Sequence, residues 1–256
     1  ARQLAGERGE EIVRTMRRGR ASAWAMITRT AVFDELILRT IERESVDLVV
    51  NLAAGLDARA FRLALPATLR WVDVDLPDIL RYKRERLGDA RPSCRYEAVP
   101  TDLTDPAARR ALFARLGAGS HRALVVTEGL LVYLTSEQVG TLAADLHAVP
   151  SFRWWLIDLA SPGLLKLMKR SWGDALERGN APFRFGPAEH VAFFEPFGWR
   201  AAEWRSTLEE ARRLRREMPG AWLWRILGRF SSQRKRDEWR RFSSYVLLQR
   251  TDGASA

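Results

Sequence analysis

The fold of this chain can be predicted from the segment Asp47-Leu-Val-Val-Asn-Leu-Ala-Ala-Gly-Leu-Asp-Ala-Arg59. Its first six residues form a short apolar run with β-branched side chains, which is typical of a buried strand. Small residues follow at 53–55, and a helical pattern begins near Arg59. A strand, a tight turn and a helix in this order predict the first unit of a parallel α/β sheet.

The same alternation continues along the chain. It predicts strands at 69–74, 94–99, 123–127 and 152–159, separated by helices at 76–88, 106–116 and 136–148. Helices of this length between strands favour right-handed crossovers and an open, mostly parallel sheet covered on both faces. Two later strands are expected at 199–204 and 244–249. The last one can enter the sheet antiparallel, either at an edge or between two neighbours.

Composition limits the possible classes of protein. The chain has 256 residues, 46% of them hydrophobic, and a single cysteine, Cys94, so it is not a disulfide-stapled miniprotein. No apolar run reaches the roughly 18 residues of a membrane span. We expect a folded cytoplasmic protein that needs neither a membrane nor a metal ion.

The net charge of +10 comes from the two ends of the chain. Residues 1–30 carry seven Arg against three acids, and residues 200–250 carry fourteen Lys or Arg against six acids. The middle is nearly neutral, which argues against nucleic acid as the partner. The basic ends are either solvated helix faces or a surface that attracts an acidic substrate or its carrier protein.

An acidic residue follows each of four predicted strands, and the carboxyl ends of parallel strands are where such sheets bind ligands. Such acids serve as helix caps and turn residues, or they bind a ligand. The first turn has Gly55 but lacks the glycine pattern of a dinucleotide site. Carboxylates suit ribose hydroxyls, an exocyclic amine and cationic groups, and S-adenosylmethionine has all three. The acids are Asp57, Asp75, Asp102 and Glu128, with Asp73 beside Asp75.

Taken together, the motifs at 51–59, 73–77 with Lys83, 101–103 and 128–134 resemble the leucine carboxyl methyltransferase family. The resemblance covers roughly residues 20–159. It implies a Rossmann-like class I methyltransferase fold: a mostly parallel seven-stranded sheet with an antiparallel last strand, a helical lid and cap insertions. We expect a lid at 1–43, a cofactor-binding core at 44–160, and an acceptor-side cap with the last strands at 161–256, all in one structural domain.

The resemblance also implies roles for individual residues, with S-adenosyl-L-methionine as the cofactor. Arg29 matches the arginine that binds the methionine carboxylate, and Glu128 matches the acid near its amino group. Ala53 stands where the family usually has glycine, and its methyl group fits if φ is negative. The other expected cofactor contacts are the turn at Ala53 and Gly55, Asp73 and Asp75 near the ribose, and Asp102 with Leu103 at the adenine.

The acceptor side is less defined. Tyr133 points either into an acceptor pocket or into the core. His190 is the candidate base in the second half of the chain. The other two histidines, His121 and His147, are expected in solvent. The function predicted is O-methylation of a carboxyl or phenolic group on a small, polyketide-like secondary metabolite, free or carrier-bound. The alternatives are methylation of a protein C-terminal carboxylate, an RNA-binding or RNA-modifying protein, and an inactive relative, which Ala53 keeps open.

Overall fold

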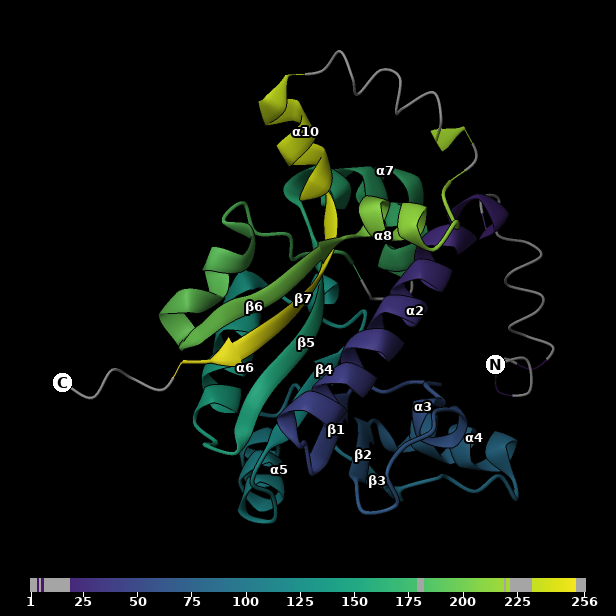
Figure 1. Cartoon of the computed structure of the whole chain (residues 1–256), viewed down its shortest axis with the longest axis vertical. Helices are drawn as coiled ribbons and strands as arrows, with labels where there is room; N and C mark the ends of the chain where they lie inside the picture. The colour runs from purple at the N-terminus through teal and green to yellow at the C-terminus, as the bar shows by residue number, and fades with distance from the viewer. Residues whose placement is uncertain are drawn as a thin grey trace.

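One seven-stranded sheet, with helices on both faces, organises the molecule (Figure 1). The computed structural model describes Leu4, Gly6 and residues 19–178, 182–218, 220–221 and 232–251. The strands are β1 (Leu48–Leu52), β2 (Arg70–Asp75), β3 (Arg95–Pro100), β4 (Ala123–Thr127), β5 (Phe152–Ala160), β6 (Trp199–Ser206) and β7 (Ser243–Arg250). The helices are α2 (Gly19–Glu44), α3 (Arg59–Arg62), α4 (Pro77–Leu87), α5 (Pro106–Ala118), η1 (Leu131–Tyr133), α6 (Ser136–His147), α7 (Pro162–Arg178), η2 (His190–Phe197), α8 (Thr207–Arg213) and α10 (Gln233–Arg240).

The strand order is β3-β2-β1-β4-β5-β7-β6. The first five strands in this order are parallel to one another, and β7 is antiparallel to both β5 and β6. The last strand of the chain therefore enters between two neighbours, which decides between the two placements left open by the sequence. The strand order reverses between β1 and β4, and this is the position where open α/β sheets bind ligands.

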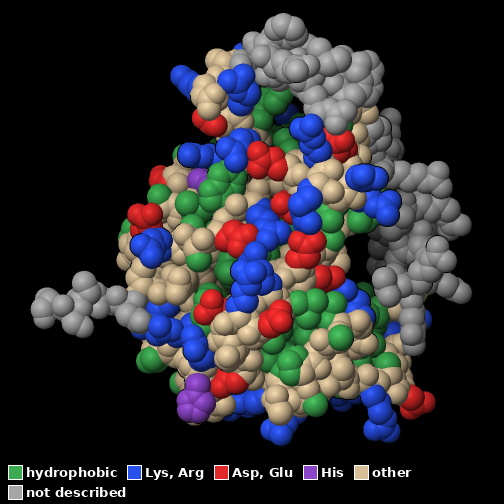
Figure 2. Space-filling model, in the orientation of Figure 1, with side chains coloured by type: hydrophobic (Ala, Val, Ile, Leu, Met, Phe, Trp, Pro, Cys, Tyr) green, Lys and Arg blue, Asp and Glu red, His purple; other side chains and the backbone are tan. Residues whose placement is uncertain are grey.

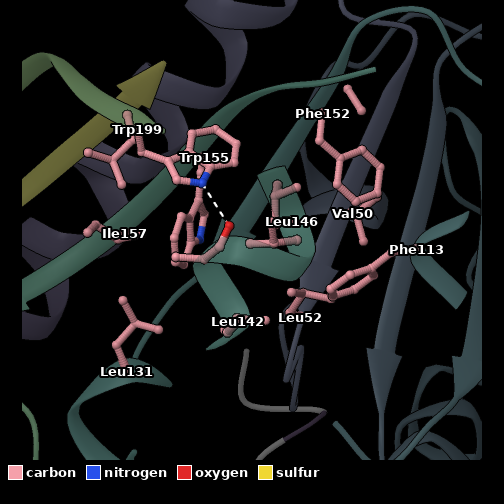
Figure 3. Close-up of a cluster of buried hydrophobic side chains, with 14 of the residues drawn as sticks. Val50, Leu52, Phe113, Leu131, Leu142, Leu146, Phe152, Trp155, Ile157 and Trp199 are labelled. Carbon is pink, nitrogen blue, oxygen red and sulfur yellow. Dashed lines mark hydrogen bonds between the residues drawn. The ribbon is translucent and has the colours of Figure 1, made fainter. Parts of the chain in front are cut away.

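The sheet buries a hydrophobic cluster on each face because successive side chains of a strand point in opposite directions. Val49 joins the cluster under α2, and Val50 joins the cluster under α5 and α6. Figure 3 shows the second cluster, in which Trp155 lies next to Trp199 with ring centroids 5.7 Å apart. Since both faces are buried, the strand ends are the part of the sheet left to bind a ligand.

The helical pattern between residues 10 and 43 predicts two or three helices. In the described residues it is one helix, α2, and residues 10–18 lie outside them. Helix α2 crosses one face of the sheet and runs past the carboxyl ends of the strands (Figure 1). None of the described helices combines the length and the hydropathy that crossing a bilayer requires.

Ion pairs fasten the basic C-terminal segment to α2. Nη2 of Arg213 lies 2.6 Å from Oε2 of Glu35, and Nη1 of Arg205 lies 3.2 Å from the same oxygen. Figure 2 shows the resulting mixture of blue and red side chains on this face. Part of the positive charge that the sequence places at this end is thus neutralised within the fold.

Candidate active site

The turn after β1 opens the candidate site. Gly55 has a φ of 51°, and its amide donates a hydrogen bond to Oδ2 of Asp75 at 2.6 Å. Among the described residues, no heavy atom beyond its chain neighbours comes within 4 Å of the position that a Cβ of Gly55 would take. The backbone of this turn is therefore open to close approach by a ligand.

Ala53, in the same turn, also has a positive φ, 51°. A negative φ was the condition for its methyl group to fit, and the structure does not meet that condition. The left-handed conformation costs an L-residue about 1–2 kcal/mol relative to glycine's freedom there. The backbone at Ala53 thus has the conformation that glycine would adopt, and the alanine side chain makes that conformation strained.

Asp75 stands at the end of β2, directly across from this turn. Its two oxygens accept from the backbone amides of Gly55 and Leu76, at 2.6 Å and 2.7 Å, and its side chain is partly exposed. A carboxylate oxygen can accept more than one hydrogen bond, so Asp75 can also receive a ligand hydroxyl.

Asp73 lies in a different environment, two residues earlier on the same face of β2. Its side chain is 1% exposed. The carboxylate is surrounded by four side-chain donors, namely Asn51 Nδ2 at 3.0 Å, Trp71 Nε1 at 2.9 Å, Lys83 Nζ at 2.6 Å and Tyr96 OH at 2.8 Å. Burial and this carboxylate raise the pKa of Tyr96. We therefore reassign Asp73 from cofactor contact to support of the site from behind.

Arg59 joins three elements below the turn. Its guanidinium is 3% exposed and lies within 2.7 Å of carboxylate oxygens of Asp34, Asp57 and Glu128. Burial alone would lower the pKa of Arg59, but Asp57 and Glu128 outweigh it and raise the pKa above its usual range. Asp57 also accepts from the amide of Arg59 at 2.8 Å. Both residues thus shape the turn.

Arg29, on α2, lies between two carboxylates. Its Nε is 2.8 Å from Oε1 of Glu128, outside hydrogen-bond geometry, and its Nη1 donates to Oδ2 of Asp158 at 3.0 Å. Burial would lower the pKa of Arg29, but Asp158 and Glu128 raise it. The structure thus brings Arg29 and Glu128 together, and the resemblance predicts both of them beside the amino-acid end of one ligand.

Sequence reasoning missed Asp158. It sits inside the apolar strand β5, where the surrounding tryptophans and leucines marked the segment as core. It is the one acid of β5, at the carboxyl end, and that strand-end position is the signal that could have found it.

The segment after β3 holds the predicted adenine contacts. Asp102 is exposed, and its carboxylate accepts from the hydroxyl and the amide of Thr104 at 2.7 Å and 2.9 Å, which lowers its pKa. Leu103 packs partly against the core. The geometry leaves the carboxylate of Asp102 accessible, and the adenine contact stays a prediction.

Tyr133 is 38% exposed, whereas Leu131 in the same short helix η1 is fully buried. The Tyr133 ring lies 5.5 Å from that of Phe183, and burial raises its pKa while Arg29 opposes the rise. The side chain therefore lies at the surface on the Arg29 side of the sheet, and it is not part of the core.

His190 is buried, with 6% of its surface exposed. Its Nε2 is 2.8 Å from Oγ of Ser244 on β7, and its ring packs edge-on against Trp204 on β6. Burial and nearby Arg241 lower the pKa of His190 to about 4. These partners lie beyond β5, away from the β1–β4 switch point, and they favour a packing role over the predicted base.

The other two histidines differ from each other. His121 is exposed at the amino edge of the sheet, as expected. His147 is not a solvent residue, because its ring packs against Trp199 and its Nε2 lies 3.2 Å from the carbonyl oxygen of Thr251.

A hollow of about 740 Å³ also lies at the amino edge, lined by His121, Arg122 and Ser151 among others. It is on the opposite side of the sheet from the carboxylates. We therefore place the candidate site by its charged groups and by the topology of the sheet.

The fold and this site define a class of protein, the Rossmann-like methyltransferases. An O-methyltransferase family protein from Burkholderia thailandensis matches with a TM-score of 0.56 and 14% identity over 98% of this chain and 63% of its own. The magnesium protoporphyrin IX methyltransferase of Synechocystis, solved with bound SAH, matches with a TM-score of 0.52 and 13% identity over 98% of both chains. At such identities the likeness shows the fold, and the predicted fold class is confirmed.

Within this class, the chain belongs to the leucine carboxyl methyltransferase family, whose sequence profile matches residues 2–147. A Parafrankia protein is 37% identical over 201 residues, covering 76% of this chain and 63% of its own. A Mycolicibacterium smegmatis protein is 38% identical over 134 residues, covering 51% and 43%. Both are named as S-adenosyl-L-methionine-dependent methyltransferases, and the chain spans less than two thirds of either. The family predicted from the motifs is confirmed, and S-adenosyl-L-methionine is its cofactor.

Proposed function

We propose that this chain binds S-adenosyl-L-methionine at the carboxyl ends of β1, β2 and β4 and transfers its methyl group to a carboxyl oxygen of a small-molecule acceptor. The names of the relatives and the family support the cofactor and the reaction class.

The observation that carries the proposal is the charge of the ion-pair network. Three guanidinium groups, those of Arg29, Arg59 and Arg62, face four carboxylates, those of Asp34, Asp57, Glu128 and Asp158. Asp75 adds a carboxylate whose hydrogen-bond donors among the described residues are neutral backbone amides. The excess negative charge favours a cationic ligand, and S-adenosyl-L-methionine carries one net positive charge.

The open turn supplies the second fit to this cofactor. The space beside Gly55 lets a ligand lie against the backbone, with Asp75 next to it to accept ribose hydroxyls. Arg29 is the group for the methionine carboxylate, and Glu128 is the group for the amino end. Asp102 and Leu103 are the expected adenine contacts.

When bound, the cofactor supplies a methyl group on a sulfonium that is already activated as a leaving group. The protein then has to hold the acceptor oxygen in line and keep water away. A carboxylate acceptor is ionised at neutral pH and needs no base, whereas a phenol has a pKa near 10 and benefits from one.

Neither candidate base is suited to take a proton from a phenol, which favours a carboxylate acceptor. His190 is buried against Ser244 and Trp204, and the raised pKa of Tyr133 keeps its hydroxyl protonated at neutral pH.

A transfer assay with radiolabelled S-adenosyl-L-methionine tests the proposal. Three acceptor panels are needed: aliphatic and aromatic carboxylic acids, phenols without a carboxyl group, and short peptides with a free C-terminus. Each is offered free and, where chemistry allows, as a carrier-protein conjugate. Base-labile label on the small acids alone is the expected result. Label on phenols would overturn the carboxyl assignment, and label on peptides alone would move the function to a protein C-terminus.

A further inference from the structure

Asp158 links three parts of the site with one carboxylate. Its Oδ1 accepts from the amide of Gly129, in the segment after β4, at 2.8 Å, and its Oδ2 accepts from Nη1 of Arg29 on α2 at 3.0 Å. In the strand register Ile157 pairs with Thr127, the last residue of β4, so Asp158 stands just past the end of that strand. It lies at the edge of the sheet, where the ligand is expected.

The guanidinium of Arg29 is fixed from two sides. Glu128 faces Nε and Asp158 holds Nη1, while the position that a Cβ of Gly129 would take is only 3.2 Å from Nη1. Gly129 has a φ of 69°, and its lack of a side chain makes room for the guanidinium. An arginine side chain loses rotamer entropy when it is ordered, and here the protein's own carboxylates order it.

The third nitrogen of the guanidinium remains available. Among the described residues, none accepts a hydrogen bond from Nη2 of Arg29, and the side chain is 25% exposed. Two neighbouring carboxylates therefore set the direction in which the remaining N–H groups point. In the same way, the hydrogen-bond partners of a metal-binding side chain fix the direction in which that side chain points.

We propose that Asp158 is a positioning residue that orients Arg29 toward the carboxylate of the methionine tail of the cofactor, an inference that rests on the proposed function. Asp158 acts through Arg29 and Gly129. Its removal leaves Arg29 charged and held by Glu128 alone, so recognition of the amino-acid tail weakens while recognition of the adenosine end is unchanged.

Two ligands that differ in the tail separate these effects. S-adenosylhomocysteine carries the amino-acid tail, and 5′-methylthioadenosine keeps the adenosine and the thioether without it. Calorimetric titration of the Asp158→Asn variant should show the affinity for S-adenosylhomocysteine reduced about 10- to 100-fold, the range for losing a charge-assisted hydrogen bond. The affinity for 5′-methylthioadenosine should change less than about twofold on the same grounds.

The matched control is Asp47→Asn. Asp47 is also a hydrogen-bonded carboxylate of this sheet, but it accepts from Ser120, His121 and Arg122 at the opposite edge. It should leave both affinities unchanged. The double variant Arg29→Met with Asp158→Asn should bind S-adenosylhomocysteine no more weakly than Arg29→Met alone, because both act on one contact.

Three outcomes would overturn the inference. Equal losses for both ligands in Asp158→Asn would show a structural role only, and so would additive losses in the double variant. No loss for either ligand would show that Arg29 needs no second carboxylate. If the asparagine variant does not fold, Asp158→Glu replaces it, because glutamate keeps the charge but moves the carboxylate. It should also weaken the binding of S-adenosylhomocysteine more than that of 5′-methylthioadenosine. A wild-type chain that binds neither ligand would instead refute the proposed function itself.

Discussion

Lys83 and Asp73 form an ion pair in which both side chains are 1% exposed, with Nζ 2.6 Å from Oδ2. The pair lies beneath the end of β2. Asp73 also accepts a hydrogen bond from the side-chain amide of Asn51, which donates to Asp57 as well, at 3.1 Å. The motif residue Lys83, which had no assigned role in the sequence, thus supports the turn that opens the site.

Replacing Lys83 by methionine should destabilise the fold strongly. The substitution keeps the volume but leaves the carboxylate of Asp73 buried without its cation, and breaking such a pair costs about 3–5 kcal/mol. Urea denaturation measures the change in the free energy of unfolding. The exposed Lys166→Met on α7 should change it by less than about 0.5 kcal/mol. A loss below about 1 kcal/mol at Lys83 would show that the pair is not needed.

Replacing Ala53 by glycine should stabilise the protein by about 0.5–1 kcal/mol. The left-handed φ of 51° strains an alanine, and glycine removes more strain than it adds in unfolded-state entropy. The neighbouring Ala54, which is buried and does not have a positive φ, is the matched control. Ala54→Gly should destabilise by about 1 kcal/mol in the same thermal melts. Equal losses of stability in Ala53→Gly and Ala54→Gly would contradict the claim that the backbone at Ala53 is strained.

His190 should make the protein less stable in acid. Its pKa is about 4 in the fold and near 6.5 in the unfolded chain, so between these values the unfolded state binds the extra proton. Stability therefore falls as pH drops from 6.5 to 4, by up to about 3 kcal/mol from this group. Above pH 6.5 its contribution is constant.

Urea denaturation from pH 7 to pH 4 tests this with His190→Asn, since asparagine tolerates the φ of 55° at this position. The variant should lose less stability over that window than the wild type, and His121→Asn, at an exposed position, should lose as much as the wild type. A variant whose acid slope equals that of the wild type would contradict the buried neutral imidazole.

The order of strands and helices could be predicted because apolar runs and helical periodicity are local properties. The placement of β7 between β5 and β6 could not, since it depends on pairing between segments far apart in the chain. The left-handed φ of Ala53 has no local signature either, because the residue type argues against it.

The strand-end acids could be predicted as a group, but their separate roles depend on packing. Asp73 and Asp75 are two residues apart on one strand face, yet four side-chain donors surround the first, whereas two backbone amides bind the second. Asp158 was hidden within an apolar strand, and its contact with Arg29 spans 129 positions of sequence.

Calorimetric titration of S-adenosyl-L-methionine into the wild type and the Glu128→Gln variant tests whether this site binds the cofactor. Glu195→Gln, an exposed position on η2, is the control. We expect one saturable site per chain, unchanged in the control and at least about tenfold weaker in Glu128→Gln, since that change removes a carboxylate paired with two guanidinium groups. A wild type that binds no S-adenosyl-L-methionine, or binding that is indifferent to Glu128, would contradict it.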